Sequence, residues 1–179
     1  MTELVHDPVS RVRYAFQRDG ENLIVDCLVE AGGALPPHRH PRQVERWSVA
    51  GGQVRFRLGD TERLIGPPDG EIVVTPGAAH GLANAGDQEA RLRCRVEPAL
   101  RLQAVLEESA AAGRRGLFTA RGLPRGLAGA RWAAGFLDRY RGETVFLSPP
   151  LPVQRVMIAL LARDPGPDPE RKEADDATQ

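Results

Sequence analysis

The sequence predicts a mainly β fold, a sandwich or barrel, followed by α-helices. In the first hundred residues, short apolar or alternating runs are separated by glycine, proline and aspartate at close spacing, as in all-β domains. Near Pro98 the hydrophobic period changes from two residues to about 3.6, the period of an α-helix. The last sixteen residues are polar, contain several prolines and have no apolar stripe, which predicts a flexible tail.

Two of the predicted strands alternate clearly. Residues 54–58 place Val54, Phe56 and Leu58 on one face and two arginines on the other. Residues 90–96 show the same alternation of apolar residues with arginines. Such a period of two puts one face in a core and the other in water. The predicted strands cover residues 12–17, 23–30, 44–50, 54–58, 62–65, 71–75, 81–84 and 90–96.

Helical periodicity marks three segments after residue 98. The first begins near residue 102 and should end at Gly113, the second covers 129–140, and the third has Pro152 in its first turn. We therefore expect a β-barrel with an N-terminal arm (1–98), a helical extension packed on the barrel or on a dimer partner (99–163), and the tail (164–179). The buried stripe of the third helix should contain Val153, Val156, Met157, Leu160 and Leu161.

The composition argues against several classes of partner. Twenty-four basic residues balance twenty-four acidic ones, so the zero net charge gives no basis for binding nucleic acid or an anionic membrane. No apolar run reaches membrane-spanning length and the N-terminus lacks a signal-peptide core, so we expect a cytoplasmic protein. Cys27 and Cys94 lie in strand-like runs and should be buried free thiols, with a disulfide as the alternative.

Histidine is concentrated in two short segments. The first segment contains His38 and His40, followed by Glu45, and the second contains His80. These are three of the four histidines in the chain. Two residues apart on a strand, His38 and His40 point the same way. Imidazoles with one carboxylate suit a divalent transition metal, so we expect one Fe, Mn, Ni, Cu or Zn ion per chain. The four side chains can share that ion only if their strands wrap around a common axis, as in a small β-barrel.

Side-chain parity predicts what surrounds the metal. Trp47 has the parity of Glu45, and Leu82 and Asn84 have the parity of His80, so all should face the interior. The candidates to line a small-molecule pocket are Trp47, Phe56, Leu82 and Asn84. For Trp47 and Phe56 the alternative is to fill the core, and for Asn84 it is to bind a local backbone turn. No organic cofactor is predicted.

At these positions the chain resembles the cupin superfamily. The first cupin motif is a glycine, five residues, His-x-His, three or four residues, a glutamate, six residues and a glycine. Gly32, His38, His40, Glu45 and Gly52 match it at every spacing.

The second cupin motif is a glycine, five residues, Pro-x-Gly, two residues, a histidine, three residues and an asparagine. Gly70, Pro76, Gly77, His80 and Asn84 match it, except that no residue separates Pro76 from Gly77. The resemblance covers about residues 10–97 and implies a double-stranded β-helix, or jelly roll, that holds a metal through His38, His40, Glu45 and His80. Cupins commonly dimerise, which implies a homodimer.

The resemblance leaves three function classes open. The first is a dioxygenase-like enzyme acting on a small molecule, with Glu45 as a ligand or, if displaced, as a catalytic base. The second is a metal-dependent isomerase, decarboxylase or lyase, and the third is a module that binds or senses a small molecule without turnover. Because function depends on the pocket and not on the barrel, the sequence leaves open whether the chain is an enzyme and what it binds.

Overall fold

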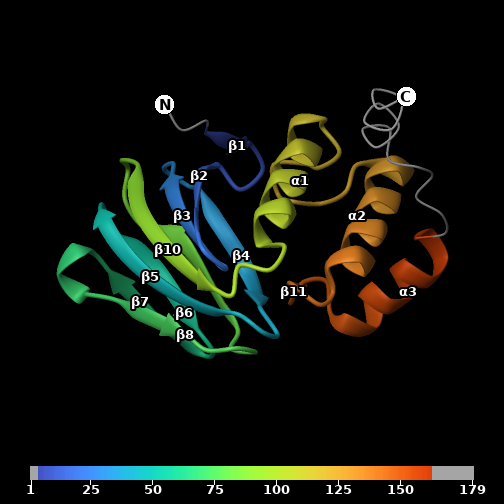
Figure 1. Ribbon diagram of the computed structural model, residues 1–179. Helices are drawn as coiled ribbons and strands as arrows, with labels where there is room; N and C mark the ends of the chain where they lie inside the picture. Colours follow the sequence, from blue (N-terminus) through green and yellow to red (C-terminus); the bar gives the residue numbers. More distant parts are fainter. Residues whose placement is uncertain (1–3, 163–179) are drawn as a thin grey trace, which may run out of the picture.

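Two antiparallel β-sheets face each other and enclose the core of a barrel, and three helices form an extension at one end (Figure 1). This computed structural model describes residues 4–162. The strands are β1 (Val5–Asp7), β2 (Val12–Asp19), β3 (Asn22–Val29), β4 (Ala34–Arg39), β5 (Val44–Gly51), β6 (Val54–Leu58), β7 (Thr61–Ile65), β8 (Ile72–Val74), β9 (His80–Asn84), β10 (Ala90–Glu97) and β11 (Val145–Phe146).

The six-stranded sheet has the order β1-β2-β3-β10-β5-β8, and the five-stranded sheet has the order β11-β4-β9-β6-β7. The predicted mainly β fold with C-terminal helices is confirmed. Each strand predicted from the sequence is present, with ends that differ by two residues or fewer. The short strands β1 and β11 were not predicted. β4 is absent from the list of predicted strands because Pro36 and Pro37 obscure its pattern, although the argument for His38 and His40 took them to lie on a strand.

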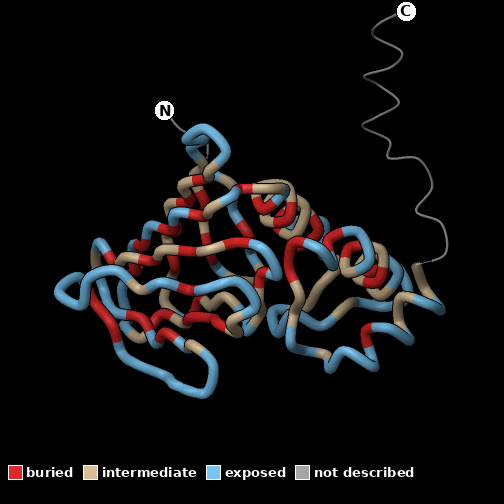
Figure 2. Tube along the Cα trace, turned by 60° about the horizontal axis from the view of Figure 1, so that its bottom comes forward, coloured by how far each residue is buried: buried red, intermediate tan, exposed pale blue. Residues whose placement is uncertain are grey.

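The core lies between the two sheets and follows the alternation of the strands. On β10, every second residue from Ala90 to Val96 is buried while the arginines between them are exposed, and the same alternation is visible on other strands in Figure 2. The five-stranded sheet contributes Phe56 and Leu82 to the same cluster. Cys27 and Cys94 are buried free thiols, as predicted.

The extension contains α1 (Leu102–Arg114), α2 (Gly126–Tyr140) and α3 (Leu151–Leu161). α1 packs against β1, and α2 packs against α3 at the end of the molecule opposite β7 (Figure 1). None of the helices within residues 4–162 is long and apolar enough to cross a membrane. The predicted tail, residues 164–179, lies outside the described residues.

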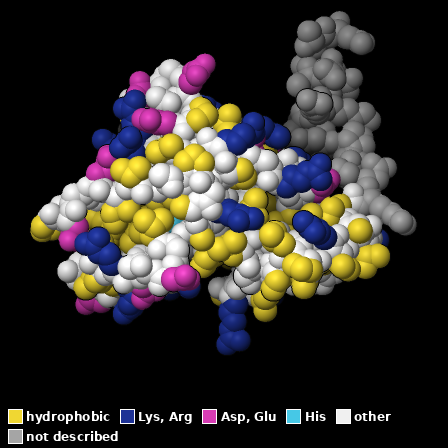
Figure 3. Space-filling view, turned by 90° about the horizontal axis from the view of Figure 1, so that it is seen from below, with side chains coloured by type: hydrophobic (Ala, Val, Ile, Leu, Met, Phe, Trp, Pro, Cys, Tyr) yellow, Lys and Arg dark blue, Asp and Glu magenta, His cyan; other side chains and the backbone are white. Residues whose placement is uncertain are grey.

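The predicted buried stripe of α3 is wrong. Val153, Val156 and Leu160 are 47%, 58% and 68% exposed, and the only buried residue of this helix is Gln154. The predicted stripe also contained Met157 and Leu161, which are half-buried. α3 packs with the face that carries Gln154, and no element of the described chain covers the opposite face. Figure 3 shows hydrophobic side chains gathered over this helical end of the molecule.

Candidate metal centre

The four predicted metal ligands lie on three strands or just beyond their ends and meet inside the barrel. His38 lies on β4 directly opposite His80 on β9, His40 follows the end of β4, and Glu45 lies on β5 in the other sheet. One potential ligand atom from each residue lies within 4.8 Å of the others. His40, Glu45 and His80 are buried, whereas His38 is half-buried. The structure therefore brings together all four residues that the sequence singled out.

Gly81 allows β9 to approach β4 closely enough for this meeting. A Cβ atom at this position would lie 2.9 Å from the carbonyl oxygen of Leu35 and 3.2 Å from the backbone of Pro37. A glycine within a strand marks such a close approach of two backbones. In the sequence, the glycine directly after His80 is the signal from which this close approach could be predicted.

Backbone carbonyls orient all three imidazole rings. His38 Nδ1 lies 2.8 Å from the Pro36 carbonyl oxygen, and His80 Nδ1 lies 3.1 Å from that of Ala78. His40 Nδ1 lies 2.8 Å from the carbonyl oxygen of Glu143. A carbonyl oxygen only accepts hydrogen bonds, so each Nδ1 carries the proton and each neutral ring keeps its Nε2 lone pair free. Such a fixed tautomer is the usual arrangement of metal-binding histidines.

The Glu45 carboxylate lies between two of these rings. Its Oε1 is 3.1 Å from His40 Nε2, and its Oε2 is 2.8 Å from His80 Nε2. Trp47 donates a hydrogen bond of 2.8 Å from its indole Nε1 to Oε2 and so holds the carboxylate in place. Trp47 is thus buried beside the site, in a role that parity alone did not predict.

The donor set fits a divalent transition metal. His40 Nε2 and His80 Nε2 are buried without a properly aligned hydrogen bond, although Glu45 oxygens lie close to both. In the neutral rings these two nitrogens are hydrogen-bond acceptors, and so is the carboxylate that faces them. Burying acceptors without a donor destabilises the fold unless a cation binds to them. Metal–ligand bonds of about 2.0–2.2 Å place neighbouring ligand atoms about 3 Å apart, close to the separations from Glu45.

Burial and the contacts within the cluster shift the pKa values of three of its members. Burial, together with the nearby His80 and His40 rings, lowers the pKa of His38 to about 3, so His38 is neutral at physiological pH. Burial acts to raise the pKa of the Glu45 carboxyl, but His40 and His80 hold it well below its usual range. Burial opposes the charged form of His40, whereas contact with Glu45 raises its pKa overall.

The other candidate residues, Phe56, Leu82 and Asn84, are buried. Phe56 is buried against Trp47, with ring centroids 6.1 Å apart, and Leu82 lies opposite Phe56 on the neighbouring strand. The side chain of Asn84 binds backbone atoms: its Nδ2 donates to the carbonyls of Val29 and Gln88, and its Oδ1 accepts from a nearby amide. Asn84 therefore stabilises a turn, the alternative considered for it from the sequence.

Sequence reasoning missed the contribution of the C-terminal extension to the site. Besides the Glu143 carbonyl, Thr144 places its Oγ1 3.3 Å from His40 Nδ1, and the Phe146 ring lies 6.2 Å from the His38 ring. These residues are more than a hundred positions away in the sequence, in a segment without a recognisable motif. A contact between a backbone carbonyl and a distant side chain leaves no pattern of residue types to detect.

Comparison with known proteins identifies the class to which this fold and donor set belong. Residues 25–96 match the family described as the cupin domain. Most of the barrel is therefore a cupin domain, as the two motifs indicated.

A solved cupin structure has the same fold. A cupin similar to RmlC from Shewanella frigidimarina aligns with a TM-score of 0.51 at 18% identity, covering 57% of this chain and 89% of that one. A double-stranded β-helix protein from Klebsiella pneumoniae aligns with a TM-score of 0.47 at 20% identity, covering 50% of this chain and 75% of that one.

One curated relative shares a shorter segment. A protein named as an oxidoreductase from the fungus Arthrobotrys oligospora is 38% identical over 58 residues. The match spans 32% of this chain and 23% of that protein. It therefore concerns only a part of either molecule.

Proposed function

We propose that this cupin binds one divalent transition metal ion through His38, His40, Glu45 and His80 and acts as a dioxygenase-like oxidoreductase on a small molecule. The observation that carries the metal proposal is the fixed tautomer of three histidines, which leaves their Nε2 atoms free beside a buried carboxylate. The relative from Arthrobotrys oligospora, named as an oxidoreductase, supports the choice of reaction class. An iron or copper ion in such a site supplies one-electron and dioxygen chemistry when bound.

The residues in and around the cluster would have different roles in such a site. Glu45 has its carboxylate held by Trp47 and a pKa well below its usual range, which suits a permanent ligand better than a base at neutral pH. His38 is the most accessible of the four, and the Phe146 ring beside it offers an apolar surface to a small molecule. Figure 3 shows a small histidine surface between hydrophobic side chains on one face.

Metal analysis of protein purified without a histidine tag tests the binding step. We expect close to one transition metal ion per chain, and His6→Ala should retain it, because His6 is exposed and lies outside the cluster. Protein that contains no metal after growth in metal-supplemented medium, and takes up none afterwards, would contradict the proposal.

Oxygen consumption with a panel of small molecules tests the reaction class. The proposal predicts uptake of dioxygen that requires both the metal and a substrate. Turnover without oxygen would instead identify an isomerase, decarboxylase or lyase, and thermal stabilisation by an unaltered ligand would identify a binding or sensing module. The homodimer and the cytoplasmic location stay predictions of the sequence, and sedimentation velocity measures the first directly.

A further inference from the structure

The strand that carries His38 depends on the C-terminal extension for one of its two neighbours. β4 pairs with β9 on one side and with β11 on the other, where Phe146 lies opposite His38. Leu147 continues this contact by donating its amide to the Pro37 carbonyl at 3.1 Å. Without β11, β4 would be an edge strand that contains two prolines, and such a strand is weakly held.

The residues just before β11 hold the ring of a second ligand. The Glu143 carbonyl accepts the hydrogen bond of His40 Nδ1, and Thr144 lies beside the same atom. The Glu143 side chain is itself buried, with one oxygen 3.5 Å from the Arg42 guanidinium and the other 3.4 Å from the Arg101 amide. One short segment therefore contacts both histidines of the His-x-His motif.

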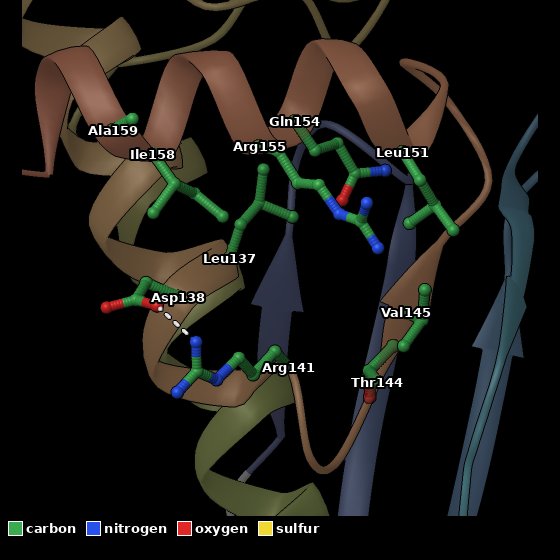
Figure 4. Close-up of a pocket in the computed structure, with 10 residues that line it drawn as sticks. All are labelled: Leu137, Asp138, Arg141, Thr144, Val145, Leu151, Gln154, Arg155, Ile158 and Ala159. Carbon is green, nitrogen blue, oxygen red and sulfur yellow. Dashed lines mark ion pairs between the residues drawn. The ribbon is translucent and has the colours of Figure 1, made fainter.

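A pocket, and not a layer of closely packed side chains, lies beside the segment that contains Thr144 and Val145. A pocket of about 410 Å³ lies between α2, α3 and the start of β11, and Thr144 and Val145 are among its lining residues (Figure 4). Gln154 reaches across from α3 into this gap. Its Nε2 donates to the carbonyls of Phe146 and Pro149, both at 2.7 Å.

The burial of Gln154 is otherwise unexplained by packing. It is 5% exposed, on a helix most of whose apolar residues are exposed. Burying an amide in place of one of those apolar residues is unfavourable unless its hydrogen bonds are needed. Both of the bonds it donates fix the loop that contains β11.

We propose that Gln154 is a positioning residue of the metal centre, acting through β11 on His38 and through the adjoining Glu143 carbonyl on His40. This inference rests on the proposed binding of a metal by the four ligands. It makes the helical extension a structural part of the metal centre.

The test uses Co²⁺ alone as the probe, with its absorption spectrum and its affinity measured by competition with a chelator. Gln154→Leu removes both hydrogen bonds at similar volume and should weaken Co²⁺ binding by roughly 10-fold or more and change the spectrum. Val105→Ala, in the buried face of α1, is the control for lost stability. It should lower the melting temperature but leave affinity and spectrum unchanged.

A Gln154→Leu protein that melts earlier but binds Co²⁺ with unchanged affinity and spectrum would overturn the inference, since Gln154 would then be merely structural. Failure of the wild-type protein to bind any metal would instead overturn the proposed function.

A second measurement on wild-type protein covers the case in which Gln154→Leu does not fold. Because coupling between two sites is reciprocal, Co²⁺ should slow hydrogen exchange of the Leu147 amide, which bonds to β4. Exchange of that amide at the same rate with and without Co²⁺, while amides between β4 and β9 are protected, would contradict the coupling.

Discussion

Strand β10 of the barrel and helix α3 of the extension bury opposite kinds of residues. β10 buries Ala90, Leu92, Cys94 and Val96 and exposes the arginines between them, whereas α3 buries only Gln154 and exposes most of its apolar side chains. In the barrel each strand is covered on the same side by the facing sheet, so alternation predicts burial. α3 is apolar on several faces, so its sequence predicts a helix but not the face that packs.

The largest expected difference between the two regions comes from a matched pair of leucines. Leu82 is 5% exposed in the barrel, and Leu160 is 68% exposed on α3. Leu82→Ala should lower the free energy of unfolding by about 2–5 kcal/mol, because it leaves a cavity in the core. Leu160→Ala should change it by less than about 0.5 kcal/mol. Denaturant titration of both variants measures the contrast, and equal losses would show that α3 is covered in solution.

A matched pair of glycines sharpens the same comparison. Gly81→Ala places a Cβ atom against the backbone of β4 and should cost about 1–3 kcal/mol of stability, together with most of the metal affinity. Gly135→Ala, in the middle of α2, has no atom within 4 Å of the new Cβ and should stabilise the helix by about 0.5–1 kcal/mol. Metal content and melting temperature of the two proteins give the result. A Gly81→Ala protein with full metal content would refute the close-approach argument.

Trp47→Phe separates the packing of this residue from its hydrogen bond. The phenyl ring keeps much of the contact with Phe56 but lacks the N–H that holds Glu45 Oε2. Loss of a partner that orients a ligand typically costs about 10–100-fold in metal affinity. Chelator competition should therefore show weaker binding in a protein that remains folded. Unchanged affinity would mean that the metal alone orients the Glu45 carboxylate.

The smallest effect is expected at the two cysteines. Burial raises the pKa of the Cys27 thiol, and the charge of Glu45 raises it further; burial and Glu45 act in the same way on Cys94. Since the thiolate is the reactive form, neither should react with a thiol reagent at pH 8 in the native protein. Both should react after unfolding. A thiol that reacts at once in the native state would show that the barrel core opens readily.

The barrel and the ligand cluster could be predicted because both leave recognisable patterns in the sequence. Alternation located strands such as β6 and β10, and the resemblance to the two cupin motifs implied that His38, His40, Glu45 and His80 share one site. The parity argument also placed Trp47 and Leu82 in the interior correctly.

What remained hidden depends on contacts between distant parts of the chain. Pro36 and Pro37 concealed β4, and β11 has only two residues. Gln154 is a polar residue within an apolar helix, and nothing nearby in the sequence shows that it binds the carbonyls of Phe146 and Pro149. Such bonds follow from the tertiary arrangement of the extension.

The most direct test of the metal centre is the metal content of His40→Ala beside that of wild-type protein, both purified without a histidine tag. His40 has its Nδ1 held by Glu143 and its Nε2 beside Glu45, so its loss removes a ligand and leaves the strand pairing of the barrel intact. We predict that the variant loses most of its bound metal and keeps a folded β-rich circular dichroism spectrum. A folded His40→Ala protein with the same metal content as wild type would contradict the assignment.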